Sequence, residues 1–224
     1  MRFVSTPLVL TSLIALGASV SSCTAGTARP HATSHVAATP TGWAGSVTAE
    51  DRSRLDALPT TWVRARAAVP VRLKAKLDAE GPLVQPGAAL DLPALPPGPY
   101  YCRLVRLGGA HGLDTYKPDF CTVDGTTHAL SFTKQSGTSL PGGWLFPDTD
   151  KRQVFLGTFR PAHADSAPPY SVNPAQDVAG VVERVAPFRW RLVLTRAGKG
   201  ALLDIYELVP VTPVVRGAVP AIPG

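Results

Sequence analysis

The clearest structural signal in this sequence is the segment Phe188-Arg-Trp-Arg-Leu-Val-Leu-Thr-Arg196. Apolar side chains stand at every second position: Phe188, Trp190, Leu192 and Leu194. Arginine or threonine takes most of the positions between them. Because successive side chains of an extended chain point to opposite faces, this alternation predicts a strand over 188–196 with one buried face.

Seven further segments have strand character, and turn-forming residues separate most neighbours. The eight predicted strands cover residues 100–107, 119–123, 127–135, 142–147, 152–160, 177–185, 188–196 and 201–209. Short links such as Asp124-Gly125 and Ala197-Gly-Lys-Gly200 are typical of hairpins, which make consecutive strands antiparallel. The expected fold is mainly β, an antiparallel up-and-down meander of about eight strands that forms a small barrel. A two-sheet sandwich is the alternative.

A helical segment is expected before the strands, over residues 46–79. Thr48-Ala-Glu-Asp51 has the form of a capping box, with aspartate in the position usually taken by glutamate. Apolar residues then recur at steps of three and four, which places them on one helix face: Leu55, Leu58, Trp62 and Ala65. Pro59 interrupts the stretch and predicts a kink or two short helices, and residues 71–79 predict one more. We expect these helices to pack on the sheet as a lid, followed by the proline-punctuated connector 81–99.

Composition limits the class of protein. The chain has 224 residues, of which 45% are hydrophobic and 17% are charged, too apolar for a disordered chain and too poor in charge for a coiled coil. The 23 prolines and 20 glycines favour short strands and turns over long helices. The net charge of +6 is not gathered into a basic stripe interleaved with aromatic residues, so no nucleic-acid partner is expected.

The N-terminus has the three-part form of a secretory signal peptide over residues 1–22. Met1-Arg2 is basic, the following stretch is apolar and uncharged, and small residues precede Cys23. Val20-Ser-Ser-Cys23 resembles a bacterial lipoprotein box, in which the cysteine receives a lipid and becomes the new N-terminus. We therefore expect an exported protein, in the periplasm or anchored to a membrane by a lipid at Cys23, with plain secretion as the alternative.

The other two cysteines, Cys102 and Cys121, lie within strand-like sequence in the expected folded region. An exported chain meets an oxidising compartment, so we expect a disulfide between them. Two buried thiols are the alternative. The chain has no Cys-x-x-Cys motif and its histidines are scattered, so neither a metal site nor a cofactor is expected.

Several segments together carry a resemblance to a known family. One is Pro97-Gly-Pro-Tyr-Tyr-Cys-Arg103, and the others span 120–121, 132–146, 154–157, 179–186, 189–194 and 203–208. The combination resembles an exported bacterial domain family, domain-of-unknown-function family 4893. The resemblance implies one exported domain over residues 46–210 and assigns no ligand or catalytic residue. Residues 23–45 before it are expected to be a flexible tether, and residues 211–224 a proline-rich tail.

The candidate binding residues fall into two groups. Three belong to loop 108–118, where Gly108, Gly109 and Gly112 allow a tight fold: His111, Asp114 and Tyr116. The other three belong to predicted strands, where they would make the barrel interior polar: His128, Lys134 and Arg184. A polar interior that also held Asp204 would be a binding site.

Catalytic motifs have weak support. Ser131-Phe-Thr-Lys134 has Ser-x-x-Lys spacing, but that chemistry needs a helix, and in a strand these two side chains point to opposite faces. His163, Asp165 and Ser166 lie on a proline-rich loop, where a solvated turn is the simpler interpretation.

The sequence therefore favours a non-enzymatic β module of the cell envelope that binds a small ligand or an envelope protein. A periplasmic hydrolase of an envelope polymer is one alternative. An inhibitor of exported proteases is another, and it depends on analogy of fold alone.

Overall fold

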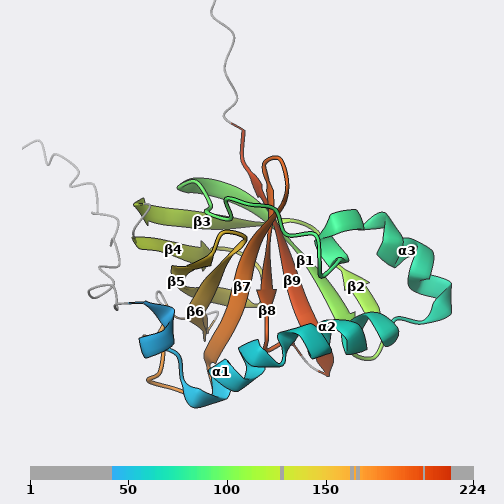
Figure 1. Cartoon of the computed structure of the whole chain (residues 1–224), viewed down its shortest axis with the longest axis horizontal. Coiled ribbons are helices and arrows are strands. Elements are labelled where there is room, and N and C mark those ends of the chain that lie inside the picture. The colour runs from blue at the N-terminus through green and yellow to red at the C-terminus, as the bar shows by residue number, and fades with distance from the viewer. Residues whose placement is uncertain (1–41, 127–128, 162–163, 165–166, 199, 213–224) are drawn as a thin grey trace, which may run out of the picture. The chain divides into compact units, whose positions relative to one another are not determined.

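Nine antiparallel strands dominate the computed structural model, which describes residues 42–126, 129–161, 164, 167–198 and 200–212 (Figure 1). The strands are β1 (Gly98–Gly108), β2 (Leu113–Thr115), β3 (Asp119–Thr126), β4 (Ala129–Lys134), β5 (Leu140–Thr149), β6 (Arg152–Arg160), β7 (Asp177–Ala186), β8 (Arg189–Leu194) and β9 (Ala201–Pro210). The helices are α1 (Ala49–Asp56), α2 (Leu58–Ala67) and α3 (Lys74–Ala79), with the short 3-10 turns η1 (Trp43–Gly45), η2 (Val71–Leu73) and η3 (Gly81–Val84). In the described part of the chain, no helix is both long and apolar enough to cross a membrane.

The sheet closes on itself. Strands β3 to β9 pair with their neighbours in sequence order, and β1 pairs with β3 on one side and with β9 on the other. The result is an eight-stranded antiparallel barrel, which confirms the predicted meander and rules out the two-sheet sandwich. Strand β2 is additional, because it pairs only with the C-terminal part of β1, where Val105 lies opposite Thr115. No alternation in the sequence marks β2, because its three residues lie within the predicted loop 108–118.

The barrel interior is a filled apolar core. Trp190, Leu192 and Leu194 of β8 point inward, as the alternation in the sequence predicts. They pack with residues such as Phe132 and Phe155, whose rings meet edge to face with centroids 6.0 Å apart. Phe188 was expected on the same buried face, and that expectation is wrong. It lies in the β7–β8 turn with φ at 53° and is 75% exposed, because β8 begins only at Arg189.

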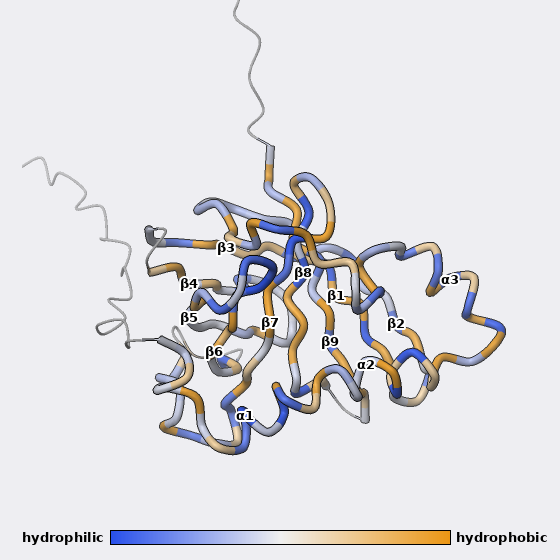
Figure 2. The backbone as a smooth tube through the Cα atoms, in the orientation of Figure 1, coloured by the Kyte–Doolittle hydropathy of each residue, from blue (hydrophilic) through white to orange (hydrophobic). Residues whose placement is uncertain are grey.

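A second apolar layer lies outside the barrel, where α1 and α2 pass across β7, β8 and β9 (Figure 1). Apolar residues recur along β7 and β9 (Figure 2), and those that pack with the helices include Val181 and Ile205. The helix residues predicted to share one face are all buried in this layer: Leu55, Leu58, Trp62 and Ala65. The helices thus pack on the outer wall of the barrel and not over its open end.

The ends of these helices agree with the sequence signals. The Thr48 side chain accepts a hydrogen bond from the Asp51 N–H and caps α1. Pro59 stands in the first turn of α2, where a proline is tolerated, so the segment divides into two helices. Trp43 also packs against the outer layer and its indole N–H donates to Asp148. The residues that pack on this layer therefore include Trp43, which precedes the expected helical segment 46–79.

Arg191 joins the helical segment to the barrel wall. It is fully buried, and its guanidinium lies 2.6 Å from Glu183 on the adjacent strand and 5.0 Å from the ring of Trp62. It also donates to four backbone oxygens in and after η3: Pro82, Leu83, Gln85 and Pro86. Glu183 thus pairs with an arginine of the next strand, and the role of this ion pair is structural.

The disulfide between Cys102 and Cys121 is confirmed, with the two Cα atoms 5.9 Å apart. Both residues are buried in the inner core, so the bond joins β1 to β3 from inside the barrel. The alternative of two buried thiols is thereby excluded.

Candidate ligand site at the barrel mouth

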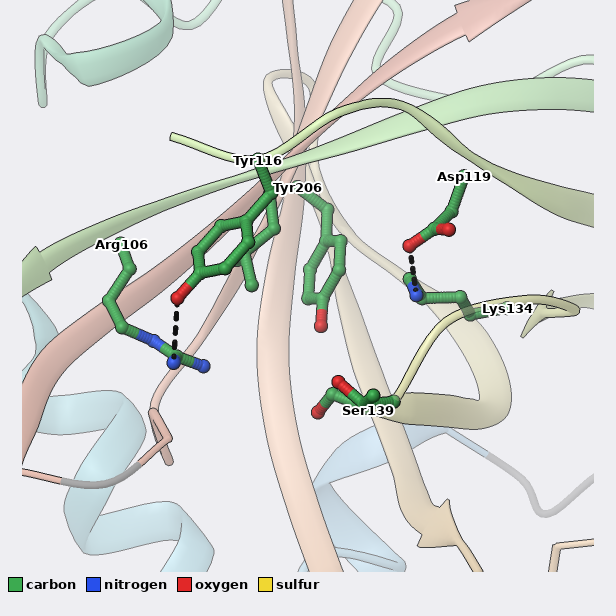
Figure 3. A pocket seen from close by; sticks show the side chains of 8 residues that line it. Arg106, Tyr116, Asp119, Lys134, Ser139 and Tyr206 are labelled. Atoms are coloured by element: carbon green, nitrogen blue, oxygen red, sulfur yellow. Dashed lines mark hydrogen bonds and ion pairs between the residues drawn. The ribbon is translucent and has the colours of Figure 1, made fainter. Parts of the chain in front are cut away.

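One end of the barrel holds a polar cavity of about 100 Å³, which we call the mouth (Figure 3). It lies where β1 and β4 end and where β5 and β9 begin. Eight residues line the mouth: Leu104, Arg106, Tyr116, Asp119, Lys134, Thr138, Ser139 and Tyr206. Alternation along the strands explains this lining, because polar side chains replace apolar ones at the last inward positions of β1 and β4 and at early inward positions of β9.

An arginine–carboxylate pair forms one side of the mouth. Arg106 and Asp204 lie directly opposite each other on β1 and β9. The guanidinium donates two hydrogen bonds to the carboxylate, at 2.6 and 2.8 Å, and this bonding raises the pKa of Arg106. The Asp204 carboxylate is almost fully buried and also accepts the Gly198 N–H. The Tyr116 hydroxyl lies 3.4 Å from the same guanidinium. Paired groups of this kind are held in a fixed geometry.

A lysine–carboxylate pair forms the opposite side. The Lys134 ammonium lies 2.6 Å from the Asp119 carboxylate, and it donates also to the Ser136 carbonyl. Only 3% of the Lys134 side chain is exposed. The Ser136 hydroxyl donates to Asp119, which ties the β4–β5 connection to the start of β3. Both cations at the mouth are therefore already neutralised by carboxylates.

Tyr206 stands between the two ion pairs, with its hydroxyl turned toward Ser139 (Figure 3). The residue is fully buried, and within the described residues its hydroxyl oxygen makes no hydrogen bond of normal geometry, although the Ser139 side chain lies close enough to oppose the rise in its pKa. Burial raises the pKa of Tyr206, and the negative charge of Asp204 raises it further. The phenol is therefore protonated at neutral pH and offers an O–H donor to the mouth.

The core closes the space beneath the mouth. Tyr100 and Trp190 meet edge to face with ring centroids 6.3 Å apart, and the disulfide lies in the same inner cluster. At the far end of the barrel the connector before β1 inserts Leu95, which is 1% exposed. The Tyr100 hydroxyl donates to the Pro96 carbonyl at 2.6 Å and fixes this connector. A ligand thus has access to the mouth and not to the barrel interior.

The structure separates the residues that the sequence analysis grouped as candidate binders. Tyr116 and Lys134 both line the mouth. His111 and Asp114 contact each other at 3.1 Å in the β1–β2 hairpin, where His111 is 76% exposed, and neither residue lines the mouth. Arg184 lies near the far end of the barrel, where its Nε donates to the Asp91 carbonyl.

Some of the sequence predictions concern residues outside the part that the structure describes. These are His128, the lipidation candidate Cys23, and the loop residues His163, Asp165 and Ser166. Within the described ranges, no three His, Cys, Asp or Glu side chains are grouped as a metal site would require.

Six of the eight lining residues were not singled out from the sequence: Leu104, Arg106, Asp119, Thr138, Ser139 and Tyr206. Three of them were detectable in principle. Arg106 follows Cys102 and Leu104 at alternate positions of β1, so a charge on an inward-facing position was visible once the strand was recognised. The same applies to Asp119 before Cys121 and to Tyr206 before Leu208. Ser139 belongs to a connection between strands, and no pattern of alternation marks such a residue.

A small antiparallel barrel with a filled interior and a polar mouth is the class of protein that this fold and site define. Within this class, the chain belongs to the family described as a domain of unknown function, DUF4893, which it matches over residues 43–208. This agrees with the resemblance seen in the sequence and covers nearly all of the described residues. Comparison with curated proteins and with solved structures finds no match to the chain.

Proposed function

We propose that this protein is a non-catalytic binding module of the cell envelope that holds a small polar ligand in the barrel mouth. The observation that carries the proposal is the Tyr206 hydroxyl. A buried polar group without a partner costs free energy, so its presence needs an explanation. Here the hydroxyl belongs to the lining of an open polar cavity, where a ligand atom would pair with it.

The lining supports binding over hydrolysis. General acid–base catalysis needs a group that can take up a proton near neutral pH. The two carboxylates at the mouth, Asp119 and Asp204, are both bound to cations, and the eight lining residues include neither histidine nor cysteine. The Ser-x-x-Lys spacing gives no alternative, because Ser131 and Lys134 lie on opposite faces of β4, with only Lys134 directed to the mouth.

The location of the protein in the cell envelope is part of the same proposal. It is supported by the signal-like residues 1–22, by the lipoprotein-like box that ends at Cys23, and by a disulfide of the kind that oxidising compartments favour. Expression of the full chain in a bacterium, followed by intact-mass measurement, tests this part. The expected mass is that of residues 23–224 plus a diacylglycerol and an acyl chain, and Cys23→Ser should abolish the addition. A mass without lipid would contradict the anchor.

Native mass spectrometry of the full chain, purified gently from cell envelopes, tests the binding role. The wild-type protein should carry a small molecule that is lost on denaturation. Ser139→Phe places a ring at the mouth and should abolish that adduct. Ser131→Phe makes the same substitution on the outer face of β4 and should retain it. An absent adduct, or one that survives Ser139→Phe unchanged, would refute the proposal.

A further inference from the structure

The charges at the mouth occur in two matched pairs, and this restricts what the mouth can bind. Arg106 is paired with Asp204, and Lys134 with Asp119, at distances of 2.6 Å in both cases. Tyr116 and Tyr206 also line the cavity. An entering anion or cation would meet charges that are already balanced: Arg106, Lys134 and Asp119 line the cavity, and Asp204 lies behind the lining and neutralises Arg106. Binding of either ion would require an existing pair to open, because like charges at close range repel.

The groups left for a ligand are uncharged hydroxyls. Tyr206 presents an O–H without a partner, and Thr138 and Ser139 on the β4–β5 connection present hydroxyls that both donate and accept. The raised pKa of Tyr206 keeps its proton in place, so it acts as a donor toward a ligand oxygen. A ligand that accepts from Tyr206 and donates to a serine or threonine hydroxyl satisfies this set.

The walls of the mouth add a size limit and an apolar surface. A space of about 100 Å³ holds a group of a few heavy atoms and not a whole drug-sized molecule. Leu104 and the ring of Tyr116 provide apolar surface beside the hydroxyls. The group that fits is therefore compact, with one carbonyl oxygen, one N–H and a small apolar end.

From these contacts, we propose that the mouth binds an uncharged amide of about the size of an acetamido group, either as a free molecule or as the exposed end of a larger one. This inference rests on the proposed function, since it names the chemistry of the same site. The amide carbonyl would accept from Tyr206, the N–H would donate to Ser139, and the methyl group would lie against Leu104.

Three molecules of nearly the same shape test the charge preference: neutral acetamide, anionic acetate and cationic acetamidinium. Each is titrated into isotopically labelled protein at pH 7 and constant ionic strength, while the backbone NMR signals of Ser139 and Tyr206 are followed. Acetamide should shift these signals in a saturable manner, and both ions should bind at least tenfold more weakly.

Two variants locate the effect. Tyr206→Phe removes only the hydroxyl and should weaken acetamide binding at least fivefold. Tyr100→Phe removes the other buried tyrosine hydroxyl of the core, which is already bonded to Pro96, and should leave acetamide binding unchanged. N-acetylglucosamine and N-acetylalanine methylamide then show whether a sugar or a peptide supplies the amide, and binding of either at Ser139 supports the proposal.

The outcomes separate this inference from the proposed function. If acetate or acetamidinium binds more tightly than acetamide, the neutral-amide inference is wrong and a binding mouth remains. The same holds if a ligand copurifies with the protein while acetamide produces no saturable shift. If no molecule copurifies and none of the three probes binds, both proposals fall.

Discussion

The sharpest prediction concerns two buried tyrosines whose hydroxyl groups have opposite surroundings. The Tyr100 hydroxyl donates to the Pro96 carbonyl at 2.6 Å, whereas the Tyr206 hydroxyl makes no hydrogen bond within the described residues. Both side chains are about equally buried, at 1% and 0% exposed. Substitution by phenylalanine removes one oxygen at each site and retains the ring, so the two variants differ only in what that oxygen contacts.

The expected magnitudes follow from this difference. Tyr100→Phe loses a hydrogen bond and leaves the Pro96 carbonyl without its donor, which should lower the free energy of unfolding by about 1 kcal/mol. Tyr206→Phe loses no protein hydrogen bond. Because the hydroxyl oxygen is buried without a partner, removing it should leave stability unchanged or raise it by up to ~1 kcal/mol. For a domain of this size, a 1 kcal/mol difference corresponds to roughly 2–4 °C in Tm.

Urea unfolding of ligand-free protein, followed by tryptophan fluorescence, measures both effects in the same assay. The m-values of the two variants should equal that of the wild type, because neither change alters the surface exposed on unfolding. Tyr206→Phe should then be the more stable variant. If it is destabilised as much as Tyr100→Phe, its hydroxyl has a partner in the protein, and the reasoning that led to the binding site is refuted.

Three further predictions concern the scaffold. Reduction of the Cys102–Cys121 disulfide should lower stability by about 3 kcal/mol, the loop-closure value for a separation of 19 residues, measured as a lower Tm in reductant. Glu183→Ala should cost ~3–5 kcal/mol in urea unfolding, because it leaves the fully buried Arg191 without its carboxylate. Burial raises the pKa of Asp177, so the folded state binds a proton at this carboxyl more tightly than the unfolded state does. The stabilisation from this protonation is present at acid pH and is lost as the pH rises from about 4 through the raised value. Asp177→Asn should remove this slope from a series of thermal melts across that range and increase stability at pH 7.

Each of these has a control or a contrary outcome. For the disulfide, the control is the wild-type protein melted without reductant. An unchanged Tm after reduction would contradict the predicted loss of stability. Glu50→Ala removes an exposed partner of Arg54 and should cost less than ~1 kcal/mol, so an equal loss in both glutamate variants would refute the role given to Arg191. For Asp177, a stability that rises with pH over the same range would show that the predicted direction of the pH dependence is wrong.

Local patterns were enough to predict the barrel. Alternation along 188–196, the turn residues between strands and the helical spacing of Leu55 and Trp62 each depend on a few neighbouring residues, and all three agree with the structure. Phe188 shows the limit of the method. It continues the alternation by identity, but the backbone turns at that residue, and the pattern contains no information on where a strand stops.

The residues that line the mouth were harder to predict from the sequence, because their proximity depends on the register between strands that are distant in the chain. Lys134 was predicted as an inward-facing residue, while its partner Asp119 lies on a different strand and was not recognised. Arg106 and Asp204 are nearly a hundred residues apart in the chain, and only the closure of the barrel places them opposite each other. His111 was singled out because it is a histidine in a glycine-rich loop, and that loop lies outside the mouth.

The closure of the barrel also determines when the mouth exists. The β1–β9 ladder joins the beginning of the strand region to its end, and pairings of such long sequence separation form late, because loop entropy opposes them until the intervening hairpins are in place. Arg106 stands on one side of this seam, and Asp204 and Tyr206 stand on the other. A partly assembled barrel therefore has no complete mouth, and the binding that we propose would require the finished fold.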